Sequence, residues 1–145
     1  MSQSLIKALE EFTAPHDETQ LRKLEKAISA ARPEELALPE FKALLRVFER
    51  FPEDDGYGIF WSILHRLEAC KGYEPALIAS VKHAPGTFNL LMLNRLHNGG
   101  IAEVDGQSLL SMLAAVAANP AASGSARQSA QDFISYQNAK RNTDA

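Results

Sequence analysis

The sequence has little of several features that would point directly to a function. Its 145 residues include one cysteine, Cys70, which excludes an internal disulfide framework and a cysteine-based zinc site. A single cysteine fits a reducing compartment, so we expect a cytoplasmic protein. The N-terminus has no basic start followed by a long apolar run, as a signal peptide would. The longest nearly uncharged stretch, residues 106–124, contains Pro120 and several serines, so we expect no membrane span.

Charge of one sign is also scarce. The chain carries 15 Lys and Arg against 18 Asp and Glu, a net charge of −3. This balance argues against direct nucleic-acid binding, which usually requires a basic surface. Hydrophobic residues make up 46% of the chain and charged residues 23%, an ordinary globular composition. The length suits one core, so we expect a single domain over residues 1–141 and a frayed tail over residues 142–145.

Helical periodicity dominates what the sequence does contain. Apolar residues recur at spacings of three and four, as in Leu5, Leu9 and Phe12. No segment of useful length alternates with period two, so the fold class is all-α with about eight helices. The expected helices lie around Leu5–Phe12 and at Glu18–Arg32, Pro39–Phe51, Tyr57–Cys70, Glu74–Ala84, Phe88–His97, Asp105 or Gly106–Ala118, and Ala126–Lys140. Asp17 and Thr87 are the expected N-caps of the second and sixth helices.

Three prolines suggest how these helices are organised. Pro52, Pro85 and Pro120 each follow an expected helix and precede a turn, at spacings of 33 and 35 residues. This period is close to the length of one helix-pair repeat. The sequence therefore allows stacked antiparallel helix pairs, as in HEAT repeats. A compact irregular helical bundle fits the same pattern equally well.

Candidate catalytic and metal-binding residues are few. His65 and Glu68 are three residues apart on one expected helix, but a di-iron pattern has the opposite order and needs further ligands. A surface pair is the favoured interpretation, with an enzyme using His65 and Glu68 as the alternative. Cys70 ends an apolar helix and is expected to be a buried thiol rather than a nucleophile. Gly99-Gly100 lacks the residues of a phosphate-binding loop. We therefore expect no catalysis, no metal and no cofactor.

One region combines acidic and aromatic side chains. Three consecutive acids at residues 53–55, called here the acidic loop, precede an aromatic stripe at spacings of four, eight and eleven residues from Tyr57. The candidate partner-binding residues are Glu53, Asp54, Asp55, Tyr57, Trp61, His65 and Glu68. Trp and Tyr are enriched at interface hot spots, so the region suits a basic partner. Alternatively, Trp61 packs in the core and the acids only face solvent, and we expect Trp61 to be at least partly core.

The central part of the chain carries a resemblance to a known class of proteins. Its most specific elements are Gly-Ile-Phe-Trp-Ser at Gly58–Ser62 and Leu-Asn-Arg-Leu at Leu93–Leu96. Over residues 40–100 the sequence resembles small all-helical immunity proteins of bacterial polymorphic toxin systems, which accompany contact-dependent or secreted toxins. The resemblance implies a cytoplasmic inhibitor that binds a cognate toxin domain and blocks its active site.

The charge distribution is compatible with such an inhibitor. Residues 1–74 carry 14 acidic and 10 basic side chains, whereas residues 75–145 carry 4 and 5. An acidic first half would steer association with a basic toxin domain, for which a nuclease is a reasonable candidate. The alternative is a helical-repeat adaptor that binds an endogenous protein or peptide. An exposed apolar stripe would equally fit a homodimer.

Overall fold

The computed structural model describes residues 2–144, with side chains for residues 3–141. The helices are α1 (Ser2–Glu11), α2 (Glu18–Ala30), α3 (Leu38–Arg50), α4 (Ile59–Glu68), α5 (Glu74–His83), α6 (Thr87–Asn98), α7 (Leu109–Ala118) and α8 (Gly124–Asp144). Two 3₁₀ turns, η1 (Pro33–Glu35) and η2 (Gly56–Gly58), precede α3 and α4, and a small hairpin of β1 (Glu103–Val104) and β2 (Gln107–Ser108) precedes α7. The predicted all-α class is therefore confirmed.

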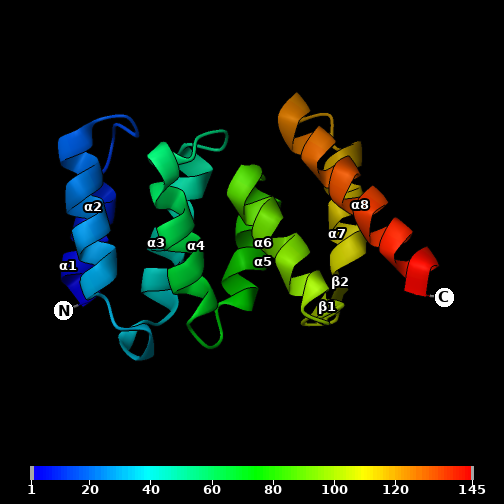
Figure 1. The fold of residues 1–145 in the computed structure, drawn as a ribbon, viewed down its shortest axis with the longest axis horizontal. Helices are drawn as coiled ribbons and strands as arrows, with labels where there is room; N and C mark the ends of the chain where they lie inside the picture. The colour runs from blue at the N-terminus through cyan, green and yellow to red at the C-terminus, as the bar shows by residue number, and fades with distance from the viewer. Residues whose placement is uncertain (1, 145) are drawn as a thin grey trace.

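The helices form four pairs that follow one another in a row (Figure 1). α1 packs on α2, α3 on α4, α5 on α6 and α7 on α8. Between pairs, α1, α3 and α5 pack in succession in one layer, and α2, α4, α6 and α8 pack in succession in another. This is the arrangement of stacked antiparallel helix pairs, and the irregular bundle is excluded for the described residues.

The turns within the pairs gather along one edge of the row (Figure 1). Pro52, Pro85 and Pro120 lie in the turns of the second, third and fourth pairs, so the proline period marks the pair repeat. Pro15 lies in the corresponding turn of the first pair. Neighbouring turns touch, since the Thr87 amide donates to the Pro52 carbonyl over 2.8 Å.

Glycine and asparagine allow this close approach between turns. A Cβ atom on Gly86 would lie 2.8–2.9 Å from atoms of Pro52, which leaves no space for any other residue. The Gly86 amide donates to the Asn89 side chain over 2.8 Å, so Gly86 occupies the N-cap position of α6. The prediction that Thr87 caps this helix is wrong, because Thr87 is already its first residue. Asp17 does cap α2, accepting from the Gln20 amide at 3.0 Å.

The expected start of α7 was placed too early. Asp105 and Gly106, at φ +50° and +78°, form the two-residue turn of the β1–β2 hairpin, in which Glu103 pairs with Ser108 and Val104 with Gln107. Successive positive φ angles are what a tight hairpin of this kind requires, and Asp-Gly favours them. α7 begins only at Leu109, after the Ser108 cap.

The ends of the last helix also differ from prediction. α8 begins at Gly124 and its backbone is helical to Asp144, beyond the expected end at Lys140. Ala145 lies outside the described residues, so fraying of residues 142–145 stays a prediction.

One continuous apolar core runs through the row. Its largest fully buried side chains come from each of the first three pairs and include Phe12, Phe48, Phe60, Leu24, Leu64 and Leu77. Phe48 stacks on Phe88 with ring centroids 5.2 Å apart, which joins α3 to α6. This core holds α4 and the turn before it, where the candidate residues lie.

Candidate partner-binding surface

The acidic loop is the turn between α3 and α4, and its carboxylates organise that turn. The Asp54 carboxylate accepts from the Gly56 amide over 2.8 Å, and it lies 3.0 Å from the His16 imidazole Nε2 in the α1–α2 turn. Asp55 accepts from the Tyr57 amide over 3.1 Å. Glu53 accepts from the Ser125 hydroxyl at the start of α8. The three acids therefore serve the fold as well as the surface, because each has a partner of its own.

The sequence predicts that Tyr57 begins a helix that runs to Cys70. In the structure, Tyr57 does not belong to α4. It lies in η2 with φ +52° and ψ +36°, between Gly56 and Gly58, which also have positive φ. Three successive left-handed residues cannot continue a right-handed helix, so α4 begins at Ile59. The residue is 68% exposed, and its ring stacks on His16 with centroids 4.8 Å apart.

Trp61 is both core and surface. Its ring meets Phe88 edge-on, with centroids 5.3 Å apart, while 40% of the residue stays exposed. His65, one turn further along α4, lies 6.0 Å from the Trp61 ring, measured between centroids. The prediction that Trp61 is partly core is confirmed. The packing against α6 fixes the ring while leaving one side open to a partner.

Glu68 has a stronger partner than the sequence indicates. Its carboxylate accepts two hydrogen bonds from Arg95 of α6, at 2.7 and 2.8 Å. The hydrogen bond to Glu68 raises the pKa of the Arg95 guanidinium above its ordinary value. His65 lies 4.0 Å from the same carboxylate. Glu68 thus joins α4 to α6, a bond that helical spacing cannot predict because the two residues lie on different helices.

The seven candidate residues all lie in the second pair, but they do not form one uniformly exposed surface. Tyr57, Trp61 and His65 present exposed surface, and Glu53 and Asp55 are exposed beside them. Asp54 and Glu68 are only partly exposed, and each is held by a side chain of a neighbouring pair, Asp54 by the His16 imidazole and Glu68 by the Arg95 guanidinium. Exposed aromatic surface and carboxylate charge therefore meet at the η2 turn.

A seam between α2 and α4 adjoins this surface, and sequence reasoning missed it. One cavity, of about 460 Å³, is lined by Glu18, Leu21, Arg22, Glu25, Lys26, Tyr57 and Ile59. A second, of about 310 Å³, is lined by Glu25, Ile28, Ser29, Ser62, His65 and Arg66. Glu25 borders both cavities, so they lie next to each other along the seam, and the two together are called here the α2–α4 groove. No periodic signal marks it, because it arises from two helices of different pairs.

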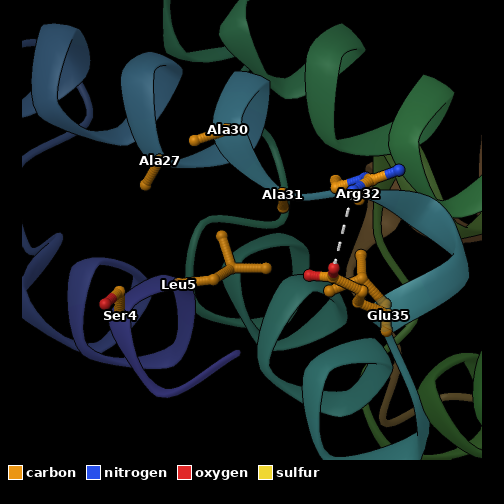
Figure 2. Close-up of a pocket in the computed structure, with 8 residues that line it drawn as sticks. Ser4, Leu5, Ala27, Ala30, Ala31, Arg32 and Glu35 are labelled. Atoms are coloured by element: carbon orange, nitrogen blue, oxygen red, sulfur yellow. Dashed lines mark ion pairs between the residues drawn. The ribbon is translucent and has the colours of Figure 1, made fainter. Parts of the chain in front are cut away.

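Another pocket lies at the N-terminal end of the row. Its walls are mostly small or apolar and come from α1, α2 and η1, with a volume of about 320 Å³ (Figure 2). The Arg32 side chain pairs with Glu35 at 4.0 Å beside it. None of the seven candidate residues lines this pocket.

The described residues offer few groups for chemistry. No group of three or more His, Cys, Asp or Glu side chains within residues 3–141 is arranged to hold a metal ion. Cys70 is buried, its thiol donates to the Arg66 carbonyl over 3.2 Å, and burial raises the pKa of the thiol. Within the described part of the chain, no helix is long and apolar enough to cross a membrane.

Comparisons with protein-family models, curated proteins and solved structures found no match to this chain.

Proposed function

We propose that this chain is an immunity protein, which binds a cognate bacterial toxin domain in the cytoplasm and blocks the active site of that toxin. The observation that carries the proposal is Tyr57. A non-glycine residue at positive φ costs of the order of 1 kcal/mol, and such strain concentrates at functional sites. Here it holds a tyrosine that is 68% exposed directly after the acidic loop. A large exposed aromatic on a rigid support is a typical interface hot spot.

The mechanism requires binding only. The stacked pairs hold the surface in a fixed shape, so little conformational entropy is lost on association. The exposed carboxylates of the acidic loop attract a basic toxin domain, with a nuclease as the candidate, and the aromatic side chains supply buried area on contact. The chain would contribute no catalytic group.

A second candidate function is favoured by the row of helix pairs itself. Helical repeats commonly present an extended surface to a protein or peptide. A helical-repeat adaptor for an endogenous partner would use the same residues. The two functions differ in what the neighbouring gene encodes, since an immunity gene lies beside the gene of its toxin.

Co-expression with the product of the adjacent upstream gene tests the proposal. We expect that product to be toxic alone, and this chain to bind it in a pull-down and restore growth. Tyr57→Gly should abolish protection, because the ring is lost while glycine accepts the backbone at φ +52° without strain. Tyr57→Gly should also be about 1 kcal/mol more stable than Tyr57→Ala.

Tyr136→Ala is the matched control, because it removes an exposed tyrosine from α8, in another pair. It should leave protection unchanged. A harmless neighbour with no complex would reject the immunity function and favour the adaptor. Full protection by a folded Tyr57→Gly variant would instead remove Tyr57 from the interface.

A further inference from the structure

The α2–α4 groove has a polarity along its length. At one end, Leu21, Ile59 and the Tyr57 ring make an apolar wall. At the other, Ser29, Ser62 and Arg66 make a polar wall. Ile59 and Arg66 are seven residues apart on α4, which separates the two ends by about 10 Å. A ligand that fills the groove must therefore be apolar at one end and polar at the other.

Some charged side chains of the groove have a partner within the protein, and others do not. Glu18 pairs with Arg22 at 3.7 Å, and the Glu25 carboxylate accepts from the Ser62 hydroxyl at 3.1 and 3.2 Å. Lys26 and Arg66 have no carboxylate within 4.0 Å among the described residues. The groove thus has an excess of cationic side chains without an ion pair, which favours an anionic occupant.

Arg66 is the cation best placed for such an occupant. It is partly buried, and its Nε is shielded from solvent without a hydrogen-bond acceptor among the described residues. Because the Nε is closed to solvent, a ligand would meet the outer guanidinium nitrogens, and a guanidinium binds a carboxylate with a pair of parallel hydrogen bonds. Lys26 is exposed on α2 and is hydrated instead. The polar end of the groove therefore suits a carboxylate at Arg66.

We propose that the α2–α4 groove binds an acidic segment of a protein partner, with an apolar side chain between Leu21 and Ile59 and a carboxylate at Arg66. A segment in the polyproline II conformation has three residues per turn and rises about 3.1 Å per residue, so two side chains on the same face lie three positions and about 9 Å apart. The inference rests on the proposed function in requiring a protein partner, and it adds the chemistry of the contact. The surface of the second pair then has a cationic end at Arg66 and an anionic end at the acidic loop. These opposite charges fix the orientation of the partner.

The test uses the protein alone with a synthetic probe, the capped peptide acetyl-Phe-Ala-Ala-Glu-amide, and two matched peptides with Gln or Lys in place of Glu. Titration is followed by ¹⁵N NMR, in which the Arg66 Nε–H gives its own signal. We expect saturable shifts of this signal and of the amides lining the groove with the Glu peptide. The dissociation constants of the Gln and Lys peptides should be at least about tenfold higher, because a charge-assisted pair of hydrogen bonds is lost.

Variants and a competitor make the result decisive. Arg66→Gln should weaken binding of the Glu peptide about tenfold, whereas Arg46→Gln, on an exposed position of α3, should not. Equal binding of the three peptides, or shifts confined to other surfaces, would overturn the proposal. Displacement of the peptide by a ten-residue oligothymidine that itself shifts Arg66 would overturn it in favour of a phosphate site. These outcomes leave the toxin pull-down untouched, so the two proposals fail separately.

Discussion

Single residues in this protein often serve both the fold and the surface. Asp54 is an example, since the same carboxylate holds the Gly56 amide and the His16 ring. Tyr73 is another: it is 5% exposed and lies just before α5, near Glu68, Glu74 and Arg95. Burial, and then the two neighbouring carboxylates, raise the pKa of the Tyr73 phenol to about 12, with Arg95 acting in the opposite direction.

This shift predicts a loss of stability at high pH. Below pH 10 the phenol is protonated in both states, so its contribution is fully present. Between about pH 10 and 12 the unfolded chain ionises while the folded protein stays neutral, and the free energy of unfolding falls. The fall attributable to Tyr73 is about 2–3 kcal/mol. Urea denaturation from pH 9 to 12 measures it. Tyr73→Phe should flatten the curve, whereas Tyr136→Phe, at an exposed position, should leave it steep.

At the scale of elements, hydrogen bonds between neighbouring helix pairs stabilise the fold, as do those within one pair. Arg50, the last residue of α3, donates to the Leu9 and Phe12 carbonyls at 2.8 and 2.7 Å. These carbonyls lie at and just beyond the end of α1, where the regular intrahelical donors run out, and the Leu9 carbonyl also accepts from the Phe12 amide at 3.3 Å. The guanidinium carbon also lies 5.4 Å from the Phe51 ring centroid. The Arg50 side chain, from the second pair, therefore caps the C-terminal end of a helix in the first pair.

Removing this side chain should loosen the first pair. Arg50→Met keeps an apolar stem but loses two charge-assisted hydrogen bonds, at a cost of about 1–2 kcal/mol in unfolding free energy. Hydrogen exchange should quicken first in α1. Lys42→Met, two turns earlier on α3 and exposed, is the control and should change neither. Unaltered exchange in α1 on replacing Arg50 would mean that water satisfies these carbonyls equally well.

Local patterns predicted the elements well and their junctions poorly. All eight helices follow from apolar periodicity and from caps such as Asp17, because both signals lie within one helix. The hairpin at Asp105-Gly106 was missed, since its strands have two residues each and carry no alternation. The start of α4 was placed too early, because the positive φ of Tyr57 depends on the two flanking glycines. The pairs Arg95–Glu68 and Arg50–Phe12 join residues 27 and 38 positions apart, which no local pattern can predict.

At the scale of the whole molecule, the structure decides between two arrangements that the proline period left equal. The period marks the pair repeat because each pair has one turn at the same edge, where a helix must stop. The surface of the second pair was only partly predictable. The acidic loop and the aromatic stripe are contiguous in sequence, whereas the α2–α4 groove needs two pairs to be stacked first.

The charge of the acidic loop should act on association with the proposed toxin domain. Asp54→Asn with Asp55→Asn removes two charges but keeps side-chain oxygens that accept from the Gly56 and Tyr57 amides. We expect the association rate constant to fall roughly threefold to tenfold at low salt, with a flatter salt dependence. Stopped-flow mixing with the toxin domain measures both. Glu34→Gln with Glu35→Gln, an acid pair in η1, should change neither, and an unchanged rate for the loop variant would place the loop outside the interface.

The contact between Glu53 and Ser125 has a mechanical consequence. It fastens the α3–α4 turn to the first turn of α8 and spans the α5–α6 turn that lies between them in the row. Both side chains lie on the surface, and Glu53 belongs to the second pair whereas Ser125 belongs to the fourth. The hydrogen bond therefore opposes motions that draw these two turns apart, and it ties together two pairs that are not neighbours in the row.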